Sequence, residues 1–309
     1  MRAKIKFNKV FFIILFCLIL IASIPIGILW YNKYSNNNYW PKLNKLPQNN
    51  SLVPTVKQEK SGTTTLSTSK IKDAIETVIN NYPQLSFGIS FIDLNTGSRV
   101  DVNGNQIFTA ASTTKVLIAC LLLSQVEAGK YSLSQSLDGS TIQVQLQQMI
   151  NQSSNDSWES LMNFMGFQYQ KPYAEKIGVT TYDVANNRIS PNDMSSILAQ
   201  LYQGKLLNPN NTKLLLSYMQ HTNNDELIPP EIPQGVAFYH KYGSFEGNLH
   251  DTAIVDNGIN PFVLTIFTST RSGFLTYSQR IMAFHQIVKA VEDSDNITSN
   301  NSPSLPANQ

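Results

Sequence analysis

The chain has 309 residues, of which 42% are hydrophobic and 14% are charged, so it can bury the core of one large domain or two small ones. Its net charge is only +2, and Lys and Arg are dispersed outside the N-terminus, so we expect no nucleic-acid partner. Cys17 and Cys120 lie in separate hydrophobic runs and are not expected to pair, and the four histidines lack metal-ligand spacing. We therefore expect no metal and no cofactor.

Residues 10–31 form an uncharged hydrophobic run that is long enough to cross a bilayer as a helix. Four basic residues precede this run: Arg2, Lys4, Lys6 and Lys9. The positive-inside rule therefore places residues 1–9 in the cytoplasm and the chain after residue 31 outside it. A cleaved signal peptide is the alternative, but the run exceeds a usual signal-peptide core and no Ala-x-Ala site follows it. We expect a single-pass signal anchor in the cell membrane and an extracytoplasmic domain.

Polar segments flank the remaining part of the chain. Residues 32–67 are rich in Asn, Ser, Thr, Pro and Lys, and residues 294–309 have a similar polar composition with prolines. Neither segment shows the apolar periodicity of a packed helix or strand. We expect a disordered linker and a disordered tail, which leaves residues 68–293 as the globular domain.

Within this domain the apolar pattern predicts strands near both ends and helices in the middle. A helix is expected over about 69–80, and strands over 86–93 and near 99–103, with a turn at 95–97. Helices are then expected to begin near Ser112, Ile142, Asn155, Pro191 and Asn208. Strands are expected near Val236, His250 and Pro261, before a last helix over about 275–292. This order predicts an α/β (α+β) sandwich, in which helices flank one antiparallel sheet and an all-helical subdomain is inserted.

The most informative motif is Ser112-Thr113-Thr114-Lys115, which precedes a strongly apolar run. If the motif opens a helix, Ser112 and Lys115 lie one turn apart on the same face. A lysine with a lowered pKa can take the proton of the serine hydroxyl and so make the serine a nucleophile. The same template occurs at Ser67-Thr68-Ser69-Lys70, but there it lies in the polar segment, and we assign it no function.

Two further short motifs follow in the chain. Ser153-Ser154-Asn155 interrupts a helical pattern, and Lys241-Tyr242-Gly243-Ser244 ends a strand-like run. Each is common by chance, but their order after the first motif is not. From residue 69 to residue 293 the chain resembles the active-site serine penicillin-recognising enzymes, and the flanking residues are most similar to class A β-lactamases. This resemblance implies the β-lactamase/transpeptidase fold at a bacterial cell surface.

The resemblance also implies catalytic roles for four residues. Ser112 would attack the carbonyl of a β-lactam or of a cell-wall peptide, and Lys115 would take its proton. Ser153 would pass a proton to the leaving nitrogen, and Lys241 would supply positive potential.

Substrate binding is implied for three residues: Asn155, Gly243 and Ser244. The side chain of Asn155 would bind an amide of the substrate. The backbone N–H groups of Ser112 and Ser244 would form an oxyanion hole.

The chain departs from the family pattern in three ways. Asn186 falls where class A β-lactamases have the glutamate that activates water for deacylation, and Asp183 or Asp193 could replace it only if the loop folds differently. Tyr242 replaces a small hydroxyl residue. No arginine for the substrate carboxylate is evident; His250 and Arg271 are candidates, although a surface or packing role is expected for each.

These departures leave the function open between alternatives. The first is a membrane-anchored serine hydrolase that opens the amide ring of β-lactams through an acyl-enzyme on Ser112. The second is a penicillin-binding D-alanyl-D-alanine peptidase, because such relatives share the three motifs without that glutamate. The third is a binding or sensing module that is acylated and does not turn over. The sequence does not indicate an oligomeric state.

Overall fold

The structure is a computed structural model that describes residues 67–294 except 272 and 274. All the described residues belong to the second of the chain's two units, Thr63–Gln309. The expected cytoplasmic segment, the membrane anchor, nearly all of the linker and nearly all of the tail lie outside the described residues. Among the helices of the described part, none combines the length and the apolar character that crossing a bilayer requires.

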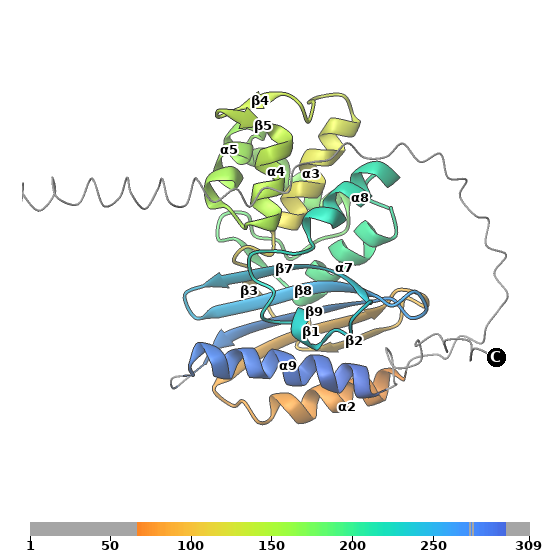
Figure 1. The fold of residues 1–309 in the computed structure, drawn as a ribbon. Helices are drawn as coiled ribbons and strands as arrows, with labels where there is room; N and C mark the ends of the chain where they lie inside the picture. Colours follow the sequence, from red (N-terminus) through yellow and green to blue (C-terminus); the bar gives the residue numbers. More distant parts are fainter. Residues whose placement is uncertain (1–66, 272, 274, 295–309) are drawn as a thin grey trace, which may run out of the picture. The chain divides into compact units, whose positions relative to one another are not determined.

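A five-stranded antiparallel sheet forms the centre of the second unit (Figure 1). Its strands in spatial order are β2 (Arg99–Val102), β1 (Leu85–Asp93), β9 (Phe262–Thr270), β8 (Asn248–Asp256) and β7 (Ala237–Phe245). The sheet thus joins two strands from the start of the domain to three from its end. The α/β sandwich and the expected strands are confirmed, because segments far apart in the sequence complete one sheet.

Helices cover both faces of this sheet (Figure 1). Helices α2 (Thr68–Ile79) and α9 (Tyr277–Ser294) lie side by side on one face. The helices on the other side are α3 (Lys115–Glu127), α4 (Ile142–Asn151), α5 (Asn155–Met165), α6 (Gln170–Lys176), α7 (Pro191–Tyr202) and α8 (Pro209–Tyr218). Short elements complete the described part: the strands β3 (Phe108–Thr109), β4 (Ser136–Leu137), β5 (Ser140–Thr141) and β6 (Arg188–Ile189), and the 3₁₀ turns η1 (Phe167–Tyr169) and η2 (Pro229–Glu231).

Two hydrophobic cores follow from this layering. One lies between the sheet and the α2/α9 layer, and it includes Ile75 and Phe284. The other joins the opposite sheet face to the helical subdomain, and it contains all the apolar residues of α3 from Val116 to Leu123. Ser67 is the N-cap of α2, so the second serine-lysine motif belongs to the α2/α9 layer.

Side-chain caps fix the starts of several helices. The Ser190 hydroxyl accepts a hydrogen bond from the Asp193 N–H at 3.2 Å, and Pro191 is the first residue of α7, as the sequence predicts. Ser154 caps α5 in the same way through the Ser157 N–H at 3.1 Å. The second of these caps also ends the turn between α4 and α5, which carries the SxN motif.

One expected boundary is wrong. The helix expected to begin at Ser112 begins three residues later, at Lys115. Ala111 has a positive φ of 50°, and the Lys115 N–H bonds to the Ser112 carbonyl at 3.3 Å, as in a 3₁₀ turn. Ser112 therefore lies in a tight turn just before α3.

Candidate active site

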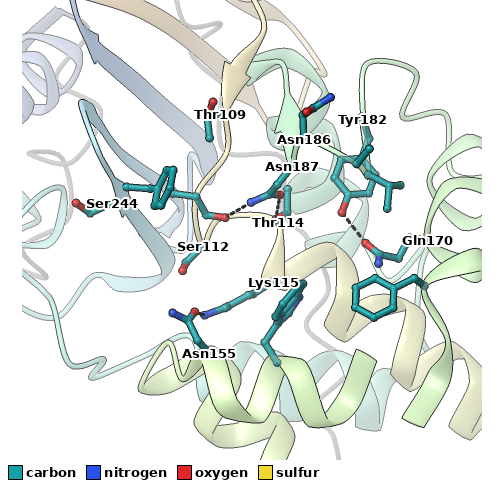
Figure 2. A pocket seen from close by; sticks show the side chains of 16 residues that line it. Thr109, Ser112, Thr114, Lys115, Asn155, Gln170, Tyr182, Asn186, Asn187 and Ser244 are labelled. Carbon is teal, nitrogen blue, oxygen red and sulfur yellow. Dashed lines mark hydrogen bonds between the residues drawn. The ribbon is translucent and has the colours of Figure 1, made fainter. Parts of the chain in front are cut away.

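The Ser112 turn is held from both of its ends. The Thr113 hydroxyl donates to the Ala110 carbonyl at 2.8 Å, and α3 anchors the other end in the core. Lys115 opens α3, and helical side chains lean toward the helix N-terminus, so its amine extends back toward the turn. Figure 2 shows the Ser112 hydroxyl directed toward the ends of the Lys115 and Asn155 side chains.

Two lysine amines converge on the turn between α4 and α5. The Lys115 Nζ donates to the Ser153 carbonyl at 2.6 Å and to the Asn155 Oδ1 at 2.8 Å. The Lys241 Nζ donates to the Ser153 Oγ at 2.9 Å and to its neighbour's carbonyl, that of Tyr242, at 3.0 Å. Ser153 thus bridges the two lysines: its backbone carbonyl accepts from Lys115 and its hydroxyl from Lys241.

Burial lowers the pKa values of both lysine amines. It lowers the pKa of Lys115 to about 8. Burial, together with repulsion from Lys115, lowers the pKa of Lys241 to about 7, although the Asp251 carboxylate opposes this shift. At neutral pH the pair therefore holds fewer than two protons, so one amine can act as a base.

Strand β7 runs directly against the Ser112 turn. A Cβ added at Gly243 would lie 2.9 Å from the Ser112 backbone nitrogen and 3.0 Å from the Ala110 carbonyl oxygen, so only glycine fits without displacement. The Ser112 N–H has no acceptor among the described residues. The side chain of Ser244 points away from Ser112 in Figure 2. The backbone N–H groups of Ser112 and Ser244, where β7 lies against the turn, are therefore the groups that can bind an oxyanion.

A cavity of about 600 Å³ opens over Ser112 and extends from β7 to α6 (Figure 2). Four of the seven expected site residues line it: Ser112, Lys115, Asn155 and Ser244. The other three do not line it: Ser153, Lys241 and Gly243. Among the described residues that line it, Lys115 is the only charged one, and none is a carboxylic acid.

The loop before β6 borders this cavity without offering a base. Asn186 lies at its edge, as expected, but its amide donates to Asp183 Oδ2 at 2.7 Å and points away from Ser112 in Figure 2. Asp193 is also engaged, because its Oδ2 accepts from the backbone N–H groups of Thr180 and Thr181 at 2.8 and 2.7 Å. Neither aspartate replaces the glutamate of class A β-lactamases.

Asn187 is a functional residue that the sequence analysis missed. Its amide nitrogen donates to the Ala111 carbonyl at 2.8 Å, and its Oδ1 accepts from the Thr114 hydroxyl at 2.8 Å. Its carbonyl accepts from the Ala110 N–H at 2.8 Å, next to the pairing of β3 with β6. Asn187 therefore braces both sides of Ser112, and no local pattern in the sequence distinguishes it from Asn186.

The residues that were considered for carboxylate recognition have other surroundings. His250 is buried, bonds to the Thr109 carbonyl at 2.8 Å and stacks on Phe267, and burial lowers its pKa to about 4, so it is neutral at pH 7. Arg271 is exposed and does not line the cavity. Tyr242 does not line it either; its ring centroid lies 4.2 Å from the Lys241 Nζ. The bulk of Tyr242 therefore leaves the cavity open.

A buried charge cluster lies next to Lys241 on β7. The His240 ring contacts Asp251 at 3.1 Å and Asp225 at 2.9 Å. Burial alone would lower the pKa of His240, but the two carboxylates raise it to about 9. His240 is therefore protonated at pH 7 and ties β7 to β8 and to the loop after α8. In the described part of the chain, no group of three His, Cys, Asp or Glu side chains is arranged to hold a metal ion.

Comparison with known proteins agrees with this geometry. A model of the beta-lactamase enzyme family matches residues 70–294, so the chain belongs to that family and is a serine hydrolase of the β-lactamase type. No curated protein matched the chain.

Several solved structures share the fold. PBP-A is 20% identical, and the match covers 74% of this chain and 100% of PBP-A with a TM-score of 0.65. An ancestral class A beta-lactamase (GNCA) is 18% identical over 72% and 99% of the two chains, with a TM-score of 0.68. A beta-lactamase from Chitinophaga pinensis DSM 2588 is 20% identical over 72% and 98%, with a TM-score of 0.68. At these identities the likeness shows the fold alone.

The neighbouring residues Asn186 and Asn187 allow a matched test of the brace. Asn187→Ala removes two side-chain hydrogen bonds and places alanine at a φ of 47°, so we expect a loss of about 2 kcal/mol in the free energy of unfolding. Asn186→Ala removes an exposed contact with Asp183, and we expect a loss below about 1 kcal/mol. Urea unfolding of both variants measures the difference, and equal losses would contradict the assigned brace.

Proposed function

We propose that the protein is acylated by β-lactams at Ser112, with opening of the amide ring, and that it releases the acyl group slowly. The observation that carries this proposal is the convergence of two depressed-pKa lysines on the Ser153 turn beside the Ser112 hydroxyl. In the proposed step, neutral Lys115 takes the Ser112 proton as the hydroxyl oxygen attacks the carbonyl carbon. The negative charge on the carbonyl oxygen is met by backbone N–H groups of Ser112 and Ser244.

Collapse of the tetrahedral intermediate breaks the carbon–nitrogen bond of the ring. The leaving nitrogen needs a proton, and the Ser153 hydroxyl can supply it because the Lys241 amine is bonded to the same oxygen at 2.9 Å. Lys241 is fully buried, so we assign it proton supply and positive potential. The Asn155 side chain holds the substrate amide through its Nδ2, because its Oδ1 already accepts from Lys115.

Slow release follows from the walls of the cavity. Hydrolysis of the ester requires a group that takes a proton from the attacking water, and an amide such as Asn186 cannot do so. The described residues that line the cavity include no carboxylic acid. One solved structure of a PBP-A mutant is an acyl-enzyme complex with penicillin-G, which supports acylation of a protein with this fold.

This absence of a carboxylate also favours a second candidate function. A D-alanyl-D-alanine peptidase would use the same acylation step on a cell-wall peptide and pass the acyl group to an amine or to water. Its substrate and a β-lactam share the carbonyl, the adjacent amide and the terminal carboxylate. Acylation by a peptide ester ending in D-alanine, followed by transfer to an added amine, would identify this activity.

Time-resolved intact mass of the full chain with benzylpenicillin tests the proposed function. We expect one adduct per chain that persists after excess penicillin is removed, without steady ring hydrolysis. Ser112→Ala should give no adduct, whereas Ser67→Ala, which alters the second serine-lysine motif, should be labelled as fast as the wild type. Steady turnover would mean that a deacylating group exists, and an adduct on Ser112→Ala would overturn the nucleophile.

The lowered lysine pKa values predict the pH dependence of acylation. The neutral fraction of Lys115 grows as pH rises toward its pKa of about 8, whereas the protonated fraction of Lys241 falls above its pKa of about 7, so the second-order rate should pass through a maximum between these two values. Below the pKa of Lys241 we expect nearly a tenfold fall for each pH unit. Lys115→Arg keeps the charge but cannot lose the proton, and it should abolish the reaction. Stopped-flow measurement of acylation at several pH values checks this, and a flat profile would argue against a lysine base.

We also propose, from the sequence pattern, that residues 10–31 anchor the protein in a bacterial membrane with the hydrolase domain outside the cytoplasm. This part of the chain lies outside the described residues. We expect the full chain in the membrane fraction, released by detergent and not by high salt, and a chain that begins after residue 31 in the soluble fraction. Equal distribution of both proteins would contradict the anchor.

A further inference from the structure

The cavity over Ser112 is much longer than the reacting groups require. Its far half lies beyond Lys115 and Asn155, between α5, η1, α6 and the loop before β6. Aromatic and aliphatic side chains line this half: Trp158, Phe167, Tyr182 and Val184. This half of the cavity therefore offers an apolar surface that the proposed acylation step does not use.

The loop before β6 leaves this space open because it folds back on itself. Asp183 and Arg188 form an antiparallel bridge, with N–H to carbonyl bonds of 2.8 and 3.0 Å in the two directions. Inside the bridge, the Asn186 amide is bound to Asp183 and the Asn187 amide to the Ala111 carbonyl. The polar side chains of the loop are thus held in contacts with protein groups.

Part of the aromatic lining is exposed to the cavity. Phe167 is 44% exposed and meets Trp158 edge to face, with ring centroids 5.9 Å apart. Tyr169 lies two residues on in the same turn and is 41% exposed, but it is not part of the cavity wall, and the Lys130 amine covers its ring at 4.2 Å. Phe167 and Trp158 therefore present ring surface to the cavity, which a bound apolar group would remove from water.

One polar side chain at the end of this half has a donor without a protein acceptor. Gln170 is 2% exposed, and its Oε1 accepts from the Tyr182 hydroxyl at 2.6 Å. Its Nε2 has no acceptor among the described residues, although Gln170 lines the cavity. This nitrogen is not one of the buried side-chain atoms without a partner, so it is open to the cavity, where a ligand or water can accept its hydrogen bond.

From these observations we infer that the far half of the cavity is a subsite for an aromatic or bulky apolar side chain on the acyl part of the substrate. The inference rests on the proposed function, because acylation at Ser112 fixes where the acyl part lies. The substrate amide would bind at Asn155, and the side chain attached to it would pass over Trp158 to Phe167. Gln170 would donate to an acceptor carried by that side chain or to a water molecule beside it.

A series of penicillins that differ only in the acyl side chain tests the subsite. The acetyl and phenylacetyl compounds keep the same amide, so any difference in their acylation rates comes from the ring. We expect the second-order rate for the phenylacetyl compound to be at least about tenfold higher, and Trp158→Ala or Phe167→Ala to remove most of this preference. Tyr169→Ala is the matched control and should leave both rates unchanged.

Binding to Ser112→Ala gives an answer that does not depend on acylation. We expect this variant to bind the phenylacetyl compound at least about tenfold more tightly than the acetyl compound in calorimetric titrations, and to lose the preference when Phe167→Ala is added. If no penicillin labels the wild type, the proposed function fails while these affinities still decide the subsite. Equal rates and equal affinities for the two compounds, or the same loss with Tyr169→Ala, would overturn the subsite.

Discussion

The central constraint in this structure is the burial of two lysine amines in one site. Burying like charges is unfavourable unless polar groups satisfy them, and here the α4–α5 turn supplies a carbonyl, a hydroxyl and a side-chain amide oxygen. Lys115 comes from the start of α3 and Lys241 from β7, so the site exists only when helix, turn and strand are packed together. The same burial that costs stability lowers the pKa values and makes a base available at neutral pH.

Strand β7 links the buried lysine pair to the rest of the sheet, because Lys241 and its neighbours on this strand also contact other elements. At Gly243 the backbone of β7 lies against Ser112, and any side chain at residue 243 would displace the turn. His240, one residue before Lys241, is held between Asp225 and Asp251 with a raised pKa. Two adjacent basic residues on one edge strand therefore have opposite environments. The histidine keeps its proton because carboxylates face it, whereas the lysine is readily deprotonated because it is buried and a second amine faces it.

The sequence predicts those helices and strands whose formation depends on strong local patterns. The apolar run after Lys115 and the Ser190-Pro191 helix start are examples, because burial and capping act within a few residues. The order of the three motifs in the chain also indicates which residues to consider for the active site. The sequence does not predict the delayed start of α3, because the turn at Ser112 is fixed by a distant residue, Asn187, through β3–β6 pairing that is only two residues long.

The loop before β6 affects the two steps of the proposed reaction, acylation and deacylation, differently. Acylation needs the lysines, Ser153 and the β7 backbone, none of which comes from this loop, whereas deacylation needs a base that the loop would have to provide. Here the loop contributes an amide brace to the Ser112 turn and leaves an apolar space where a base would otherwise lie. The same short, self-bonded loop would thus account both for the stable acyl-enzyme that we propose and for the space beside it. In the proposed reaction, such a protein would select its acyl group by the side chain and retain it, and release would depend on an acceptor that reaches the ester.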